Sequence, residues 1–420
     1  MKKIANKGTR IKRRIEIQAM TEKELHFEED MATIQTLIGL GMKAATDRIQ
    51  SEFVALVGQR YEHGKAMGPW GSNPGSIYLG DQKVAIEVPR ARNARTGEEA
   101  TLASYARLQS PRVIEDMALR RVINGISMRK YEEAALSIPE TFGISRDSVS
   151  RRWIRASAKK LAALNERSLS GYDIVAIFLD GKHFSTDHEI IAALGVTIMG
   201  EKVILGIVET STENYVVCRD FVRGLLERGL QAEDPILCII DGGKGLHKGL
   251  KEVLGEQAVI QRCQWHKREN VLKYLPKGRQ DEFRRKLQGA YEQPAYEAAK
   301  KMLETIKREL RGINISAVNS LDEGFEETLT LHRLGIFEKL GRSFKTTNAI
   351  ENVNSLMGIY TDRVDYWKNS EQRQRWVATA LLQIEPRLHR VSGYQHLSEL
   401  RSAMALMIEK KNCSELKAAA

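Results

Sequence analysis

Two apolar runs in this chain each end in an aspartate followed by glycine. In the first, apolar residues 174–179 precede Asp180 and Gly181, and in the second, apolar residues 236–240 precede Asp241 and two further glycines. Unbroken apolar runs of this length are typical of strands buried on both faces of a sheet. Binding and catalytic sites gather at the carboxyl ends of such strands. The pattern therefore predicts a buried sheet with two carboxylates at its strand ends.

The segments around these runs predict a mixed α/β sheet. Strand-like runs occur at 174–179, 190–198, 203–209 and 236–240, with a fifth candidate in AVIQRCQWH, residues 258–266. An amphipathic helix ending at Gly229 and another near 246–254 separate the later strands, an order typical of α/β folds. Residues 267–342 are highly charged at helical spacing and predict a helical insertion, after which a further helix starts near Asn348.

The first 165 residues predict mainly helical modules. Residues 20–62 and 101–165 have helical spacing, the Gly- and Pro-rich residues 63–76 predict a loop, and residues 77–97 predict a short β-hairpin with basic residues. We therefore divide the chain into an N-terminal helical region (1–75), a hairpin with a DNA-binding region (76–165), a first core segment (166–266), the insertion (267–342), and the last core helices with a C-terminal tail (343–420).

The charge of the chain indicates a polyanionic partner. Its 420 residues carry a formal net charge of +11 and a pI of about 9.3, which is most simply explained by binding to nucleic acid. No apolar run approaches the roughly 18 residues of a membrane span. The basic N-terminus is not followed by the apolar segment of a signal peptide, so we expect a cytoplasmic protein.

The four cysteines argue against a disulfide scaffold and against a zinc finger. They are scattered through the chain without a Cys-x-x-Cys pair. Cys218 and Cys238 stand in apolar segments, so we expect both to be buried thiols.

The carboxylates suit a divalent metal. Mg²⁺ prefers oxygen ligands, and two such ions can activate an attacking oxygen and stabilise a leaving one in phosphodiester chemistry. A third carboxylate is available at Glu351, which shares a polar helix face with Asn348, Asn352 and Ser355, while Ile350, Val353 and Met357 cover another face. Two structural alternatives stay open: Asp-Gly pairs that simply turn the chain, and a capping box between Asn348 and Glu351.

These motifs together resemble the Mutator-type transposases of bacterial insertion sequences. The resemblance is carried by FLDG at Asp180, IIDGGKG at Asp241, CQWH at 263–266 and TTNAIENVNS around Glu351, and it covers residues 30 to 400. It implies a ribonuclease H-like core with an Asp-Asp-Glu triad, interrupted by a helical insertion before the Glu. On this resemblance Asp180, Asp241 and Glu351 are the metal ligands for Mg²⁺ or Mn²⁺, with two ions expected.

Cys263 and His266 match the Cys-x-x-His motif of the same family. By spacing alone they are half of a zinc site, for which the sequence offers no second half. We expect His266 to be catalytic, either contacting DNA or orienting a carboxylate. The alternative is a satisfied core pair at a strand end.

Residues 127–161 resemble a helix-turn-helix. Gly143 suits the tight turn and Ser145 is a good N-cap. The exposed side of the second helix would carry the basic residues Arg146, Arg151, Arg152, Arg155, Lys159 and Lys160, which suit phosphates and groove edges. The alternative is a solvated basic helix that leads into the core.

We therefore predict a metal-dependent DNA transposase. It would bind the terminal inverted repeats of its element, hydrolyse a phosphodiester at each end and join the freed 3′-hydroxyl to target DNA. Handling two ends together favours a homodimer or larger assembly, and no membrane partner is expected. The alternatives are a nuclease or resolvase with the same core but no strand transfer, and a helix-turn-helix regulator whose α/β domain senses a ligand.

Overall fold

The computed structural model describes residues 40–59, 65–79, 82–109, 123, 146–185, 188–211, 214–364 and 366–419. It divides into two compact units, Met1–Val122 with Ile126–Trp153, and Ile123–Gly125 with Ile154–Ala420. Helix α5 (Arg146–Asn165) crosses the division. Within the described ranges, every helix is too short or too polar to cross a membrane.

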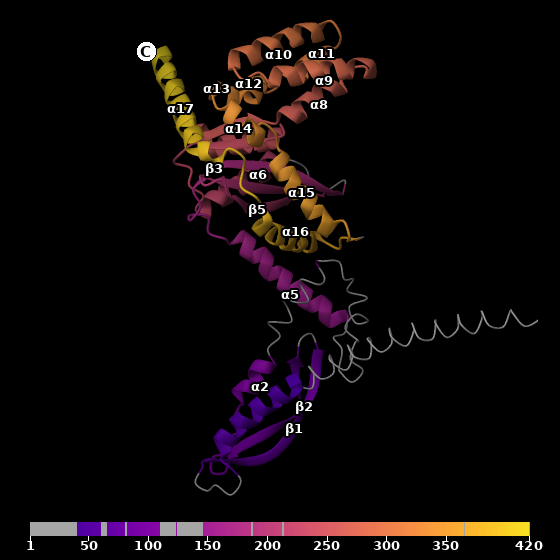
Figure 1. The fold of residues 1–420 in the computed structure, drawn as a ribbon, viewed down its shortest axis with the longest axis vertical. Helices are drawn as coiled ribbons and strands as arrows, with labels where there is room; N and C mark the ends of the chain where they lie inside the picture. The colour runs from indigo at the N-terminus through magenta and orange to yellow at the C-terminus, as the bar shows by residue number, and fades with distance from the viewer. Residues whose placement is uncertain are drawn as a thin grey trace, which may run out of the picture. The chain divides into compact units, whose positions relative to one another are not determined.

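The first unit is built on a long β-hairpin (Figure 1). Strands β1 (Met67–Leu79) and β2 (Gln82–Asn93) pair antiparallel, beside a helix at residues 40–57 and helix α2 (Ala103–Leu108). The loop expected over residues 63–76 is wrong from Met67 onward, because these residues form most of β1. Each strand of a two-stranded sheet has one unpaired side, and for this reason the prolines of β1 are tolerated.

Glycine in β1 serves packing rather than a loop. A Cβ at Gly75 would lie 2.6 Å from both Tyr105 Oη and Val88 Cγ2. The strand therefore approaches α2 and β2 more closely than any larger residue would permit. The small core between these elements consists of Ala45, Ile49, Ile77, Val88 and Leu102.

The second unit contains the predicted mixed sheet. Its strands are β3 (Ile174–Ser185), β4 (His188–Thr197), β5 (Lys202–Thr210), β6 (Ile236–Ile240) and β7 (Ala258–Arg262), in the order β5-β4-β3-β6-β7. The pairs β3–β4 and β4–β5 are antiparallel, and β3–β6 and β6–β7 are parallel. Every strand expected from its apolar run is present.

One expectation about β3 is wrong. The strand does not end at Asp180, since it continues to Ser185 and pairs Asp180 with Ala192 and Gly181 with Ile191 of β4. The parallel pairing to β6, in contrast, ends at Leu179 opposite Ile240. Asp180 therefore lies beside the end of the neighbouring strand, although its own strand goes on. Gly181 makes no turn, and a Cβ there would collide with the buried side chain of Glu189.

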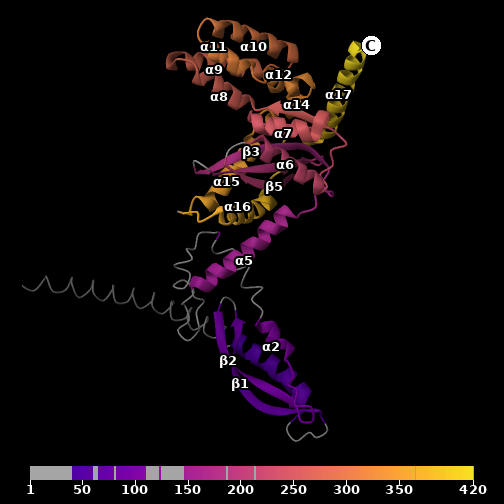
Figure 2. The same ribbon diagram turned by 180° about the vertical axis from the view of Figure 1, so that it is seen from behind.

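Helices cover both faces of the sheet (Figures 1 and 2). On one face α6 (Tyr215–Glu227) and α7 (Lys244–Leu254) pack against Ile177 and Leu179, and Cys218 and Cys238 are buried there as expected. On the other face lie α15 (Asn348–Thr361) and α16 (Ser370–Ile384). Because side chains alternate along a strand, Asp180 points to the α15 face.

The region between β7 and α15 is helical, as predicted. It comprises α8 (Gln264–Lys273), α9 (Lys277–Tyr291), α10 (Tyr296–Arg311), α11 (Ile315–Asp322), α12 (Phe325–Thr328), α13 (Thr330–Arg333) and α14 (Phe337–Phe344). The first of these helices share their own apolar core, which includes Phe283 and Leu303. Helix α13 also covers the outer edge of β7, where Thr330 Oγ1 donates to the carbonyl of Ile260 at 2.6 Å. Helix α17 (Leu397–Ala419) ends the chain.

Candidate active site

The three predicted carboxylates come from three elements that meet at one edge of the sheet. Asp180 lies in β3, Asp241 directly follows β6, and Glu351 lies in the first turn of α15. Asn354, one turn further along α15, donates its side-chain amide to Asp180 Oδ2 at 2.8 Å. This hydrogen bond fixes α15 over the sheet at Asp180 and so holds Glu351 beside the two aspartates.

The pKa of Asp180 reflects the proximity of the other two carboxylates. The pKa of Asp180 is raised from 3.8 to about 6, first by burial and then by the negative charges of Asp241 and Glu351. The nearby His266 and the hydrogen bond from Asn354 act in the opposite direction. The site thus concentrates negative charge that a cation would neutralise.

Glu351 does not cap its own helix. The N-cap of α15 is Thr347, and Asn348 is already the first helical residue, so the alternative of a capping box between Asn348 and Glu351 is wrong. Glu351 Oε1 instead accepts a hydrogen bond of 2.5 Å from Thr347 Oγ1. The carboxylate is therefore oriented by a side chain and remains available to a ligand.

The polar face expected on α15 is only partly correct. Ile350, Val353 and Met357 are buried as predicted. Asn352 and Ser355 are exposed, and the polar residue that contacts the site is Asn354, which the sequence reasoning missed. The spacing in the sequence could have indicated this role. Thr347 and Asn354 stand four residues before and three residues after Glu351, and therefore lie on the same side of the helix.

Cys263 directly follows strand β7, and His266 lies in the first turn of the next helix, α8. Cys263 is the N-cap of this helix, and its sulfur accepts hydrogen bonds from both the backbone N–H and the hydroxyl of Thr347, each at 3.4 Å. The same hydroxyl lies 3.3 Å from His266 Nδ1. Thr347 thus connects the Cys-x-x-His pair to Glu351.

The contact between Cys263 and His266 shifts their two pKa values in opposite directions. The hydrogen bond with Cys263 raises the pKa of His266 to about 9 against the opposing effect of burial, and the negative charges of Cys263, Asp241 and Glu351 act in the same direction. Burial acts to raise the pKa of Cys263, but hydrogen bonds from His266 and Thr347 outweigh it and the pKa is lowered. His266 therefore adds a positive charge next to the carboxylates at neutral pH.

Glu351 also completes a group that could hold a metal ion. Ligand atoms of Cys263, His266 and Glu351 lie within 4.8 Å of one another. The half zinc site read from the sequence thus gains a third possible ligand from a distant segment. In the part of the chain that the structure describes, the three carboxylates do not form so tight a group. Two ions about 3.5–4 Å apart need ligands that are spread more widely than those of one ion. The wider spacing of the carboxylates is therefore compatible with the two ions expected from the sequence.

The proposed recognition helix is α5. Arg151, Arg155 and Lys159 are exposed on it, whereas Trp153 and Leu164 are buried. The side chains of Arg146 and Arg152, and the first helix of the expected helix-turn-helix, lie outside the described residues. The helix therefore has the predicted division into a buried side and a basic side.

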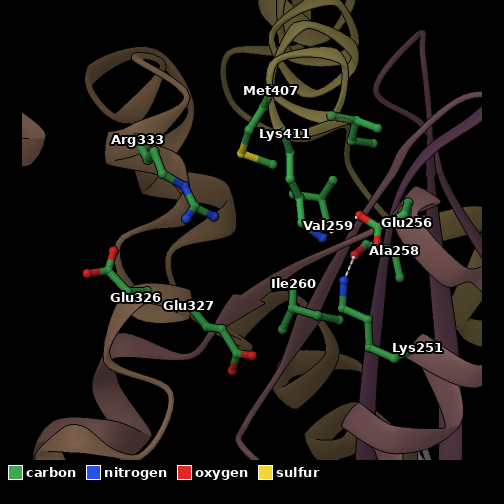
Figure 3. A pocket seen from close by; sticks show the side chains of 11 residues that line it. Lys251, Glu256, Ala258, Val259, Ile260, Glu326, Glu327, Arg333, Met407 and Lys411 are labelled. Atoms are coloured by element: carbon green, nitrogen blue, oxygen red, sulfur yellow. Dashed lines mark hydrogen bonds and ion pairs between the residues drawn. The ribbon is translucent and has the colours of Figure 1, made fainter. Parts of the chain in front are cut away.

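A well-formed pocket lies away from these residues. Figure 3 shows it between β7, α12–α13 and α17, with a volume of about 340 Å³. Lys251 donates to the carbonyl of Ala258 at 2.7 Å, and Lys411 pairs with Glu256 at 2.8 Å. Because both lysines are already engaged and none of the predicted site residues lines the pocket, the carboxylate site remains the stronger functional candidate.

Comparisons with known proteins identify one family. The family model described as “Transposase, Mutator family” matches residues 23–387. The chain is 24% identical over 336 residues to the transposase for insertion sequence element ISRM5 of Rhizobium meliloti (strain 1021), covering 78% of this chain and 81% of that protein. It is 24% identical over 350 residues to the transposase for IS905 of Lactococcus lactis subsp. lactis (strain IL1403), covering 80% and 85%. A segment of 120 residues is 36% identical to the transposase for IS6120 of Mycolicibacterium smegmatis, covering 27% and 36%.

Proposed function

Because the chain belongs to the Mutator family of transposases, we propose that it binds the terminal inverted repeats of an insertion sequence and both cuts and joins DNA strands there. The observation that carries this proposal is the proximity of Asp180, Asp241 and Glu351, where the pKa of Asp180 is raised first by burial and then by the charges of its two neighbours. A site built in this way needs a cation, and the substrate of a transposase supplies phosphodiesters.

The strand order supports a ribonuclease H-like core. The central strand β3 is flanked by the antiparallel strands β4 and β5 on one side and by the parallel strands β6 and β7 on the other. The three carboxylates come from β3, from the residue after β6 and from helix α15, which lies on one face of the sheet. Asp180, Asp241 and Glu351 would hold two Mg²⁺ or Mn²⁺ ions. When bound, such ions activate an attacking oxygen and stabilise the leaving one.

The chain's own groups prepare this site for DNA. Thr347 and Asn354 hold two of the carboxylates in place by hydrogen bonds. His266, protonated at neutral pH, offers a positive charge to a phosphate that approaches the carboxylates. The same charge reduces the repulsion between the carboxylates and that phosphate.

Incubation of the full-length protein with labelled element-end DNA, with and without Mg²⁺ or Mn²⁺, tests the proposal. We expect metal-dependent cuts at the element end that leave 3′-hydroxyls, followed by joining to a second DNA. Cutting without joining would indicate a nuclease or resolvase of the same core. Binding without cutting in either metal would indicate a DNA-binding regulator.

The orientation of Glu351 by Thr347 leads to a further prediction. Thr347→Val removes the hydroxyl that donates to Glu351, and hydrogen bonds to a charged group contribute about 1.5–3 kcal/mol. We expect cleavage to fall by about ten-fold or more and the half-saturating metal concentration to rise. Thr347→Ser keeps a hydroxyl and should restore both values. Loss of cleavage in the Ser variant with near-normal cleavage in the Val variant, which keeps the methyl group, would show that packing rather than the hydroxyl matters.

Basic residues of α5 provide the corresponding prediction for DNA binding. Replacing Arg151, Arg152 and Arg155 with Ala should weaken binding to end DNA and flatten its salt dependence. Each lost phosphate contact should reduce the log–log slope by roughly 0.9. Titrations at several salt concentrations measure both quantities. Unchanged affinity and slope in the triple variant would remove α5 from the DNA interface.

A further inference from the structure

A polar groove lies beside the candidate active site, between the start of α7 and helices α8 and α11. Its volume is about 770 Å³. The residues that line it are mostly hydrogen-bonding or charged: Lys244, Asn270, Lys273, Tyr274, Ser316, Asn319, Ser320 and Glu323. None of them belongs to the carboxylate site or to the basic side of α5, so the groove is a separate surface.

Two elements connect this groove to the active site. Along α8, His266, Asn270 and Lys273 follow one another at i, i+4 and i+7 and therefore lie on one side of the helix. Lys244 stands three residues after Asp241, in the first turn of α7. Seven residues of helix rise by about 10 Å. A strand that keeps the duplex rise of roughly 3.4 Å per nucleotide would reach Lys273 about three nucleotides from His266.

The groove has more positive than negative charge. Glu323 is shared by three cations, with nitrogens of Lys244, Arg262 and Lys267 at 3.7–3.9 Å from its oxygens. Lys273 adds another charge and donates only to the neutral side chain of Asn270 within the described structure. The groove lining itself thus carries two positive charges, Lys244 and Lys273, against the one negative charge of Glu323, which favours an anion.

The walls are held at a fixed separation. Lys267 Nζ donates to the carbonyl of Ser320 at 2.7 Å, and Asn314 Nδ2 donates to the carbonyl of Tyr274 at 2.8 Å, so α8 and α11 are joined at two levels. The side chain of Tyr274 is not enclosed by these contacts, since the residue is 49% exposed. A rigid cationic groove with an exposed aromatic ring is the arrangement that binds single strands by phosphate contacts and base stacking.

We propose that this groove binds one DNA strand about three nucleotides from the phosphate that is cut. Lys244 and Lys273 contact its phosphates, and Tyr274 stacks on a base. The inference rests on the proposed function, because the active site defines where the strand starts. It extends that function by giving the helical insertion a direct contact with the substrate.

End DNAs shortened stepwise on either side of the cut position test the groove. Binding of the full-length protein is measured in EDTA, so that affinity is determined independently of cleavage. We expect the DNA affinity of the wild type to fall when one strand, on one side of the cut position, is shortened to fewer than about three nucleotides from that position. Lys273→Ala combined with Tyr274→Ala should bind long DNA about ten-fold more weakly and lose this length dependence. Tyr274→Phe should retain the stacking.

Lys301→Ala is the matched control, because Lys301 is an exposed lysine of the same insertion and does not line the groove. It should bind like the wild type at every strand length. If the Lys273→Ala, Tyr274→Ala double variant kept the length dependence of the wild type, the proposed role of the groove would be wrong. The same would follow if Lys301→Ala lost as much DNA affinity as the double variant. Failure of the wild type to cut long DNA in the presence of metal would instead count against the proposed function alone.

Discussion

Glu351→Gln is expected to fold and to bind end DNA like the wild type, but to lose cleavage and joining by several orders of magnitude. Gln is a poor ligand for Mg²⁺, yet its side-chain oxygen can still accept the hydrogen bond from Thr347. The variant therefore removes the charge and keeps the local structure. Cleavage of labelled end DNA, DNA affinity and the free energy of unfolding are measured on the same preparation.

Glu338→Gln provides the control for this variant. Glu338 is an exposed glutamate of the neighbouring helix α14, so its replacement removes the same charge away from the site and should leave cleavage unchanged. Near-normal cleavage by Glu351→Gln would exclude Glu351 as a ligand. Two other glutamates of the second unit, Glu209 and Glu269, would then be the next candidates, although each already pairs with an arginine, Arg373 at 2.6 Å and Arg268 at 3.0 Å.

The parts of the fold that could be predicted are those in which burial alone determines where apolar residues stand in the sequence. The runs at 174–179 and 236–240 are apolar because both faces of the central strands are covered by helices, and these runs place Asp180 and Asp241 correctly at one sheet edge. Most of strand β1 was instead predicted as a loop. Its packing against β2 and Tyr105 leaves room only for small residues such as Gly75. Glycine and proline suggest a loop unless that packing is known.

The motifs predict the candidate site residues but not the groups that support them. Asp180, Asp241, Glu351 and His266 are recognisable from motifs, whereas the roles of Thr347 and Asn354 depend on how α15 lies on the sheet. Thr347 contacts Cys263, which is 84 residues away in the sequence, and Asn354 contacts Asp180 across 174 residues. No local pattern reports such contacts. The extension of β3 past Asp180 likewise depends on pairing with β4 rather than on the apolar run itself.

Asp180→Asn is expected to abolish cleavage while making the metal-free protein more stable above pH 6. In the folded wild type the pKa of Asp180 is raised from 3.8 to about 6, so the folded state resists its ionisation. Stability is therefore unaffected below about pH 4, falls as the pH rises from 4 to 6, and stays reduced above pH 6. The size of the shift corresponds to roughly 3 kcal/mol at most. Asn can still accept the hydrogen bond from Asn354, so the fold should be retained.

Denaturant unfolding in EDTA between pH 4 and pH 8 measures this effect. The wild type and Asp180→Asn should have equal free energies of unfolding near pH 4, where Asp180 is protonated in the folded wild type, and should separate between pH 4 and 6. Added Mg²⁺ should restore stability to the wild type above pH 6 and do little for the variant, because only the wild type has the charge that the ion neutralises. Glu297→Gln, on an exposed face of α10, should follow the wild type throughout. Parallel pH profiles for wild type and Asp180→Asn would mean that burial and the neighbouring carboxylates do not raise the pKa of Asp180. The cation site would then have to be sought at Cys263, His266 and Glu351.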